Sequence, residues 1–143
     1  MQRRIKVFID TNIILTGTFF SGQETILLRV TDIDLFTADV CLEEARKVTA
    51  RSMFGEDTET ALEKLENTFV AFNIVNESDY SHLLPHASLL IPKKKNDQKV
   101  LAAALFTKPD FFLSRDSDFD KKNIRRILNL KTANEVLQEL GVV

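Results

Sequence analysis

The chain has 143 residues, of which 44% are hydrophobic and 28% charged, with four Gly and three Pro. This composition is close to that of average globular proteins and excludes a disordered chain, and the length predicts one domain, residues 1–143, around a single core. The formal charge of −2 excludes a protein that binds nucleic acid through its net charge alone, so such binding would have to come from local patches.

The chain contains one cysteine, Cys41. This excludes an internal disulfide and any zinc site built from several cysteines, and it suits a reducing compartment, so we expect a cytoplasmic protein. The first apolar run, residues 5–9, is too short for the core of a signal peptide, and no later run reaches the length of about 18 apolar residues that a membrane span needs. We therefore expect a soluble protein with no membrane contact.

The first half of the chain alternates short apolar runs with helical patterns. Residues 5–9 are apolar and largely β-branched, which predicts a buried strand, and Asp10-Thr11-Asn12 is a cluster of turn and capping residues that leads into a helix. The elements expected next are a helix at 24–30, a strand at 34–37, a helix capped by Asp39 that runs to about Ser52, a break at Gly55, a helix at 57–69 and a strand at 71–75.

The second half continues this alternation. A helix begins at Ser78-Asp79 and ends before Pro92. The remaining predicted elements are an Ala-rich helix at 97–107 capped by Asn96, a strand at 110–114, a short strand at 125–128, and a helix at 132–140 that Gly141 ends. Because parallel strands need helical crossovers, the alternation predicts an α/β fold with a mainly parallel sheet of about five strands.

Two aspartates, Asp10 and Asp116, follow predicted apolar strands. In an open α/β sheet, ligands bind beyond the carboxyl ends of the strands. Either residue alone is explained equally well as a turn or capping residue, but two of them at this edge favour a binding site.

Glu44 is distinguished from its neighbour Glu43 by helical geometry. Residues three, four and seven apart share one face of a helix. Glu44 borders the small and apolar stripe of its helix, whereas Glu43 points away from it. The predicted stripe consists of Cys41, Ala45, Val48 and Ser52.

We expect Asp97 on the buried face of its helix. It precedes Val100, Leu101 and Ala104 by three, four and seven residues, the intervals that place side chains on one face. The alternative is a favourable charge at a helix N-terminus, although Asn96 is available as the cap. Acids gathered in a partly desolvated place repel one another and resist ionisation, and a divalent cation removes that cost. Oxygen ligands suit Mg²⁺ or Mn²⁺, which would activate water for attack on a phosphodiester.

Four segments, in this order, resemble the successive signature motifs of PIN domains, and together they extend over nearly the whole chain. They are Val7-Phe8-Ile9-Asp10-Thr11-Asn12, Glu44 with Val48 and Arg51 behind it, Asn96-Asp97 before Val100-Leu101-Ala102-Ala103-Ala104, and Phe112-Leu113-Ser114-Arg115-Asp116-Ser117-Asp118-Phe119.

The resemblance implies a three-layer α/β/α sandwich in which the first and fourth strands are neighbours. It also implies roles: Asp10, Glu44, Asp97 and Asp116 as catalytic ligands of Mg²⁺ or Mn²⁺, with Asn12, Ser114 and Asp118 in support. The spacing after Ser114 favours Asp116 as the closer ligand, but Asp118 stays open.

PIN proteins of this length are often VapC-like toxins of VapBC-type toxin–antitoxin pairs. The resemblance therefore implies a metal-dependent ribonuclease with RNA as substrate, and an antitoxin protein and a second copy of the chain as candidate partners. The alternatives are a catalytically weak PIN domain that binds RNA or protein, and a housekeeping nuclease that processes RNA.

Several cations lie near the proposed site and are candidates for contacts with RNA phosphates, although a run of lysines is more often a solvated loop. These cations are Lys93, Lys94, Lys95 and Arg115, and the same two readings apply to Arg46, Lys47 and Arg51 beside Glu44.

Two other enzyme sites are disfavoured. His82 and His86 are four apart, but Pro85 lies between them and no Glu follows His82, so a zinc-binding HExxH motif is missing. A phosphatase of the haloacid-dehalogenase type would use Asp10 as nucleophile and needs an acid two residues later. That position is Asn12, which does not exchange a proton.

Overall fold

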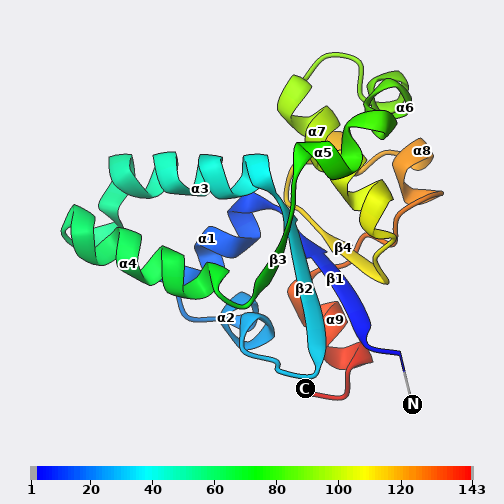
Figure 1. Ribbon diagram of the computed structural model, residues 1–143. Coiled ribbons are helices and arrows are strands. Elements are labelled where there is room, and N and C mark those ends of the chain that lie inside the picture. Colours follow the sequence, from blue (N-terminus) through cyan, green and yellow to red (C-terminus); the bar gives the residue numbers. More distant parts are fainter. Residues whose placement is uncertain (1–2, 143) are drawn as a thin grey trace.

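Four parallel strands form the centre of the molecule, in the order β3-β2-β1-β4 (Figure 1). The structure, a computed structural model, describes residues 3–142. The strands are β1 (Ile5–Ile9), β2 (Ile33–Ala38), β3 (Phe72–Val75) and β4 (Phe111–Leu113). The α/β fold with a parallel sheet is thereby confirmed, with four strands in place of about five.

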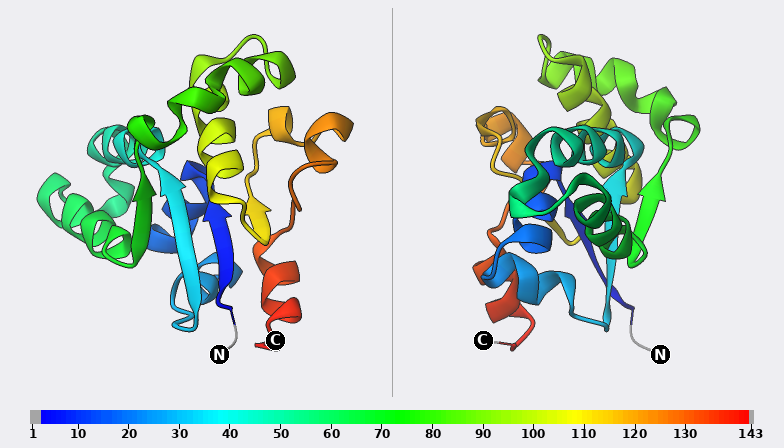
Figure 2. Two further views of the ribbon diagram at one scale, coloured as in Figure 1. Left: turned by 45° about the vertical axis from the view of Figure 1, so that its right-hand side comes forward. Right: turned by 90° about the vertical axis from the view of Figure 1, so that its left-hand side faces the viewer.

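Helices connect the strands and cover both faces of the sheet (Figure 2). The α-helices are α1 (Thr11–Phe19), α2 (Gln23–Leu28), α3 (Asp39–Ser52), α4 (Thr58–Phe69), α5 (Glu77–Tyr80), α6 (Leu84–Leu90), α7 (Lys95–Thr107), α8 (Lys122–Arg125) and α9 (Ala133–Glu139). Within residues 3–142 the short 3₁₀ helices are η1 (Met53–Gly55), η2 (Ser81–Leu83) and η3 (Ser117–Phe119).

Side chains that alternate along β1 divide the core into two halves, because successive residues of a strand point to opposite faces. Val7 and Ile9 join the buried cluster that contains Leu65 of α4 and Leu137 of α9. Phe8 joins the other buried cluster, with side chains of α7. A sheet buried on both faces is the middle of three layers, as the resemblance to PIN domains implied.

The predicted strand at 125–128 is wrong. Its first residue ends α8, and the following chain meets β4 only at one bridge, between Phe112 and Leu130. The physical reason is burial: Leu128 is 5% exposed, but Ile127 is 44% exposed. A strand in a parallel sheet is buried on both of its faces. In this segment Leu128 is buried, but its neighbour Ile127 is exposed.

Two helix starts also differ from the prediction. Asp39 is the first residue of α3, and the cap position is Ala38. The carboxylate of Asp39 accepts from its neighbour Val40 N at 2.8 Å and, outside the helix, from Tyr80 Oη at 2.6 Å and Glu77 N at 3.0 Å. In α7 the helix begins at Lys95, so Asn96 lies inside the first turn and caps nothing. The helix expected from Ser78 is divided into α5, η2 and α6.

The ends of other helices agree with their sequence signals. Asp10 caps α1 by accepting from Thr11 N, and Thr132 and Glu135 form a capping box at α9. Gly55, with a φ of 80°, stands at the break after α3. Within residues 3–142, none of the helices combines the length and the apolar character that crossing a membrane requires.

Candidate active site

The carboxyl ends of β1 and β4 lie side by side, since Ile9 pairs with Leu113 in the parallel register. The backbone N–H of Asp10 donates to the carbonyl of Leu113 at 2.9 Å. Ser114 Oγ then donates to Asp10 Oδ2 at 2.7 Å and accepts from the backbone N–H of Asp116 at 3.0 Å. One serine hydroxyl therefore holds both strand-end aspartates in place.

The carboxylate of Asp10 is oriented by further donors. Its Oδ1 accepts from Thr11 N at 2.8 Å and from the buried thiol of Cys41 at 3.5 Å. Burial raises the pKa of Asp10, while the hydrogen bonds from Ser114 and Thr11 act in the opposite direction. Asp10 is therefore a fixed carboxylate at the base of the site.

Three other carboxylates of the site lie close to one another. One oxygen each of Asp97, Asp116 and Asp118 lies within 4.8 Å of the others. Asp97 stands in the first turn of α7, and Asp116 precedes η3 and accepts from Asp118 N at 2.9 Å. Phe119, which is fully buried, packs its ring on Phe112 at 5.1 Å between centroids and thereby fixes η3 against the sheet.

Asp97 is the most perturbed acid of this group. Its Oδ2 is buried, and no hydrogen-bond donor within residues 3–142 reaches it. Burial, the adjoining carboxylate of Asp118, to which only a protonated Asp97 can donate, and the charge of Asp116 raise the pKa of Asp97 to about 7. An acceptor without a donor costs free energy, so this oxygen is adapted to a cation or to a proton.

Lys94, which precedes α7, forms an ion pair with Asp118 of η3. Its Nζ lies 2.7 Å from Asp118 Oδ2. The ammonium group lowers the pKa of Asp118, and Asp118 raises the pKa of Lys94. The opposite directions of the two shifts indicate one ion pair, which Coulomb attraction stabilises.

Glu44 reaches the site from α3. It is exposed, but partial burial and the charges of Asp10 and Asp116 raise its pKa. The buried stripe of α3 is Cys41, Ala45 and Thr49, so the predicted place of Ser52 in this stripe is wrong and Ser52 is exposed. The 3.6-residue period moves the stripe from Val48 to Thr49 in the third turn.

The structure thus brings all four predicted acids to one edge of the sheet, but not into one compact set. Asp10 and Glu44 lie outside the tight group, and Asp118, predicted only in support, lies inside it with Asp97 and Asp116.

Comparison with known proteins identifies the family. The model of the PIN domain family matches residues 8–140. The chain belongs to the PIN domain family. PIN domains are generally nucleases, and PIN nucleases typically use divalent metals. A search of curated proteins gave no match.

Among solved structures, this PIN domain is similar to a chain in the crystal structure of VapBC2 from Rickettsia felis bound to a DNA fragment from their promoter. The TM-score is 0.65, the sequence identity is 13%, and the alignment covers 90% of this chain and 98% of that chain. At this identity the likeness supports the three-layer fold alone.

The residues predicted in support have different surroundings. Ser114 holds Asp10 and Asp116, as described above. Asn12 is exposed on α1, and within residues 3–142 its side chain makes no hydrogen bond. Arg115 donates to Thr16 Oγ1 at 3.0 Å and to Glu24 Oε1 at 2.5 Å, and so ties the loop after β4 to α1 and α2.

Sequence reasoning missed two contacts of this PIN domain. Cys41 was interpreted as a small hydrophobe, but its thiol also donates to Asp10. The position of Cys41 could have indicated this contact. Cys41 lies near the start of the helix that follows β2, and β2 is the neighbour of β1, at whose end Asp10 lies. Lys94 was interpreted as a cation of a loop, and its pairing with Asp118 joins residues too far apart in the sequence to be read together.

Proposed function

We propose that this PIN domain is a metal-dependent ribonuclease that hydrolyses RNA phosphodiester bonds. The observation that carries the proposal is the buried, unpartnered Asp97 Oδ2 in a group of three carboxylates whose oxygens lie within 4.8 Å of one another. The proposed metal ligands and catalytic residues are Asp10, Glu44, Asp97 and Asp116, with Asn12, Ser114 and Asp118 in support.

The donor set fits Mg²⁺ or Mn²⁺. All the side chains are oxygen donors, which these ions prefer, and Asp10, Glu44 and Asp97 have raised pKa values that a nearby cation would lower. A bound ion of this kind supplies an activated water and stabilises charge on the leaving oxygen of a phosphodiester.

The chain's own residues orient the site. Ser114 holds the carboxylates of Asp10 and the backbone of Asp116 together, so these two acids keep a constant separation. Asp118 anchors Lys94 beside Asp97. A site held by short hydrogen bonds loses little free energy to reorganisation when a substrate binds.

Lys93, Lys94 and Lys95 are proposed to contact the phosphates of RNA at the start of α7, where all three are exposed. Lys94 pairs with Asp118 at 2.7 Å and would contact a phosphate through its remaining N–H donors. Arg115 was considered for the same role. Because its two terminal nitrogens already bind Thr16 and Glu24, the geometry favours a structural role for Arg115.

The test is incubation of the purified protein with end-labelled RNA in Mn²⁺, in Mg²⁺ and in chelator. We expect cleavage with metal, none with chelator, and none by Asp97→Asn, which keeps the shape of the side chain but removes its charge. Unchanged cleavage by Asp97→Asn in saturating Mn²⁺ would contradict the ligand assignment. RNA binding without any cleavage would instead favour a catalytically weak PIN domain.

The biological proposal is a toxin whose partner is an antitoxin protein. It is supported by the size of the chain, by the PIN family and by the fold shared with a VapBC2 chain. Induced expression in the native host should slow growth, and an Asp10→Asn form at the same protein level should not. Equal harmlessness of both forms would favour a housekeeping nuclease. A homodimer is proposed as well, and light scattering measures its mass.

A further inference from the structure

Two cations on α3, Lys47 and Arg51, lie on the face of the helix that Glu44 shares. They follow Glu44 by three and by seven residues, the intervals that place side chains on one face. Both are exposed, and within residues 3–142 neither forms an ion pair with an acid. We call these two residues the α3 basic ridge.

The neighbouring cation, Arg46, has a different environment. Its guanidinium binds Glu66 of α4, with Nη2 at 2.5 Å from Oε1 and Nε at 3.2 Å from Oε2. Arg46 is therefore directed toward α4 and is neutralised there, although it is adjacent to Lys47 in the sequence.

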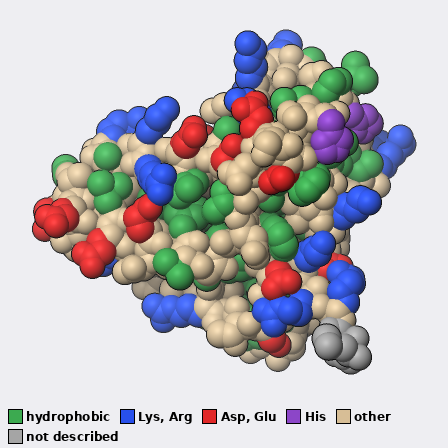
Figure 3. Space-filling model, viewed as in Figure 1, with side chains coloured by type: hydrophobic (Ala, Val, Ile, Leu, Met, Phe, Trp, Pro, Cys, Tyr) green, Lys and Arg blue, Asp and Glu red, His purple; other side chains and the backbone are tan. Residues whose placement is uncertain are grey.

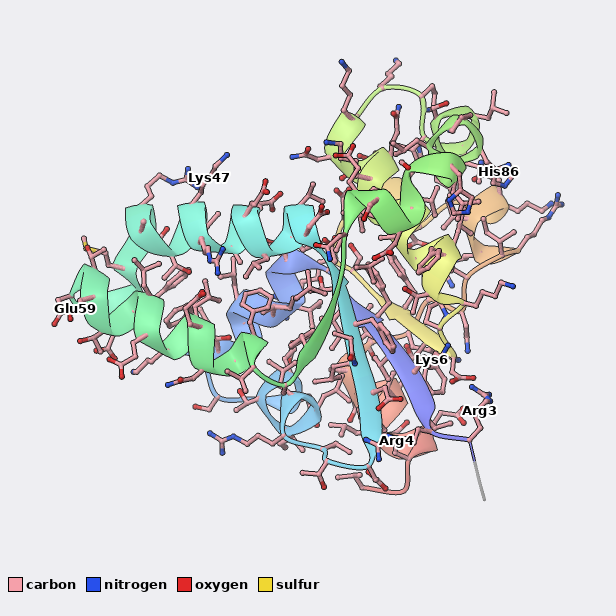
Figure 4. All side chains as sticks on the ribbon, in the orientation of Figure 1. Arg3, Arg4, Lys6, Lys47, Glu59 and His86 are labelled. Atoms are coloured by element: carbon pink, nitrogen blue, oxygen red, sulfur yellow. The ribbon has the colours of Figure 1, made fainter. Side chains whose placement is uncertain are left out.

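The figures show how the ridge lies relative to the acids. Lys47 extends from α3 away from α4 (Figure 4). On the surface, cationic side chains gather over α3 and over the loop before α7, and acidic side chains lie in the hollow between them (Figure 3). The acidic site is thus flanked by positive charge on two sides.

A chain of phosphates needs such flanking charge to approach the acids. The carboxylates themselves repel a polyanion, and the net charge of −2 provides no general attraction. At a rise of about 1.5 Å per residue, Lys47 and Arg51 lie about 4.5 and 10.5 Å along the helix axis from Glu44. Positive charge therefore extends along α3 from the edge of the acidic site.

We propose that the α3 basic ridge is a binding track for the RNA backbone on the side of the acids opposite the Lys93–Lys95 loop. This inference rests on the proposed function, because it takes RNA as the ligand. Phosphate contacts fix the position of a strand and carry no base information, so the track binds RNA of any sequence. Lys47 is the better test residue, since Arg51 in the last turn of α3 also stabilises the helix end.

The experiment measures the salt dependence of RNA binding by fluorescence anisotropy, with labelled single-stranded RNA of two unrelated sequences. All proteins carry Asp97→Asn and the buffer contains chelator, so the RNA stays intact. Lys47→Gln is compared with Arg46→Gln, which removes the same charge one residue away. Thermal melting verifies that both variants fold.

We expect Lys47→Gln to reduce the slope of log affinity against log salt by about 0.7, the value for one phosphate contact with a single strand. Arg46→Gln should leave the slope unchanged, and both RNA sequences should behave alike. Equal slopes for the two variants, an effect restricted to one RNA sequence, or no RNA binding by the Asp97→Asn parent would overturn the proposal. Cleavage of RNA by the unmodified chain is measured separately. Cleavage together with equal slopes for Lys47→Gln and Arg46→Gln would reject the binding track but not the nuclease. A changed slope for Lys47→Gln without any cleavage would reject the nuclease but not the track.

Discussion

The acid cluster should make the metal-free protein less stable as pH rises. The pKa of Asp97 is about 7 in the folded protein, against about 3.9 in an unfolded chain. At a pH between these two pKa values, Asp97 keeps its proton in the folded state and has released it in the unfolded state. The free energy of unfolding therefore falls from about pH 4 to about pH 7 and is constant above that, as far as Asp97 contributes.

The size of this effect follows from the pKa shift. About three units correspond to roughly 4 kcal/mol, but Asp97 is only partly buried, and solvent screening reduces the expected effect to about 1–2 kcal/mol. Asp97→Asn removes the titrating group. Relative to the parent, the variant should gain about 1–2 kcal/mol between pH 5 and pH 8.

The assay is urea denaturation of both proteins in chelator at pH 5 and pH 8. Asp32→Asn is the control, because Asp32 is exposed and outside the cluster. Added Mn²⁺ at pH 8 should stabilise the parent more than Asp97→Asn, since a ligand stabilises the state that binds it. A parent and an Asp97→Asn variant with the same pH dependence would refute the reasoning.

Three further predictions concern single side chains. Glu44→Gln should lower RNA cleavage by orders of magnitude, whereas Glu43→Gln should cleave normally and stay within about 0.5 kcal/mol of the parent in stability; equal activity of the two would show that the helix register is wrong. Ser114→Ala removes two hydrogen bonds and should lower the free energy of unfolding by about 1–3 kcal/mol in urea denaturation, and an unchanged midpoint would contradict this. Lys94→Gln should raise the pKa of Asp118 in NMR titration while Lys93→Gln does not, and the same titration curve in both variants would argue against the ion pair.

Much of the site could be predicted because its acids follow local rules. Asp10 follows β1 directly and Asp116 follows β4 by three residues. Parallel strands end at the same edge of a sheet, so the strand pattern predicted this edge for both acids, and the resemblance to PIN domains implied that the two strands are neighbours. Asp97 was singled out by helical spacing, and its partly buried position agrees with that reasoning.

Other features depend on contacts between distant segments, which no local pattern contains. Asp118 enters the tight acid group because η3 is held by the packing of Phe119 on Phe112. The same limit explains the segment at 125–128, whose apolar residues suit a strand although the chain meets β4 only after it, at the bridge between Phe112 and Leu130.

Residue type and spacing were enough to predict the alternation of strands and helices, the edge of the sheet at which the acids lie and a donor set made of oxygen atoms alone. The folded structure was needed to find which carboxylates form the tight group, which lysine pairs with Asp118 and which cations of α3 have no acidic partner within residues 3–142. Those properties depend on distances between side chains far apart in the chain, such as the 2.7 Å between Lys94 and Asp118, and electrostatic interactions vary with distance and burial.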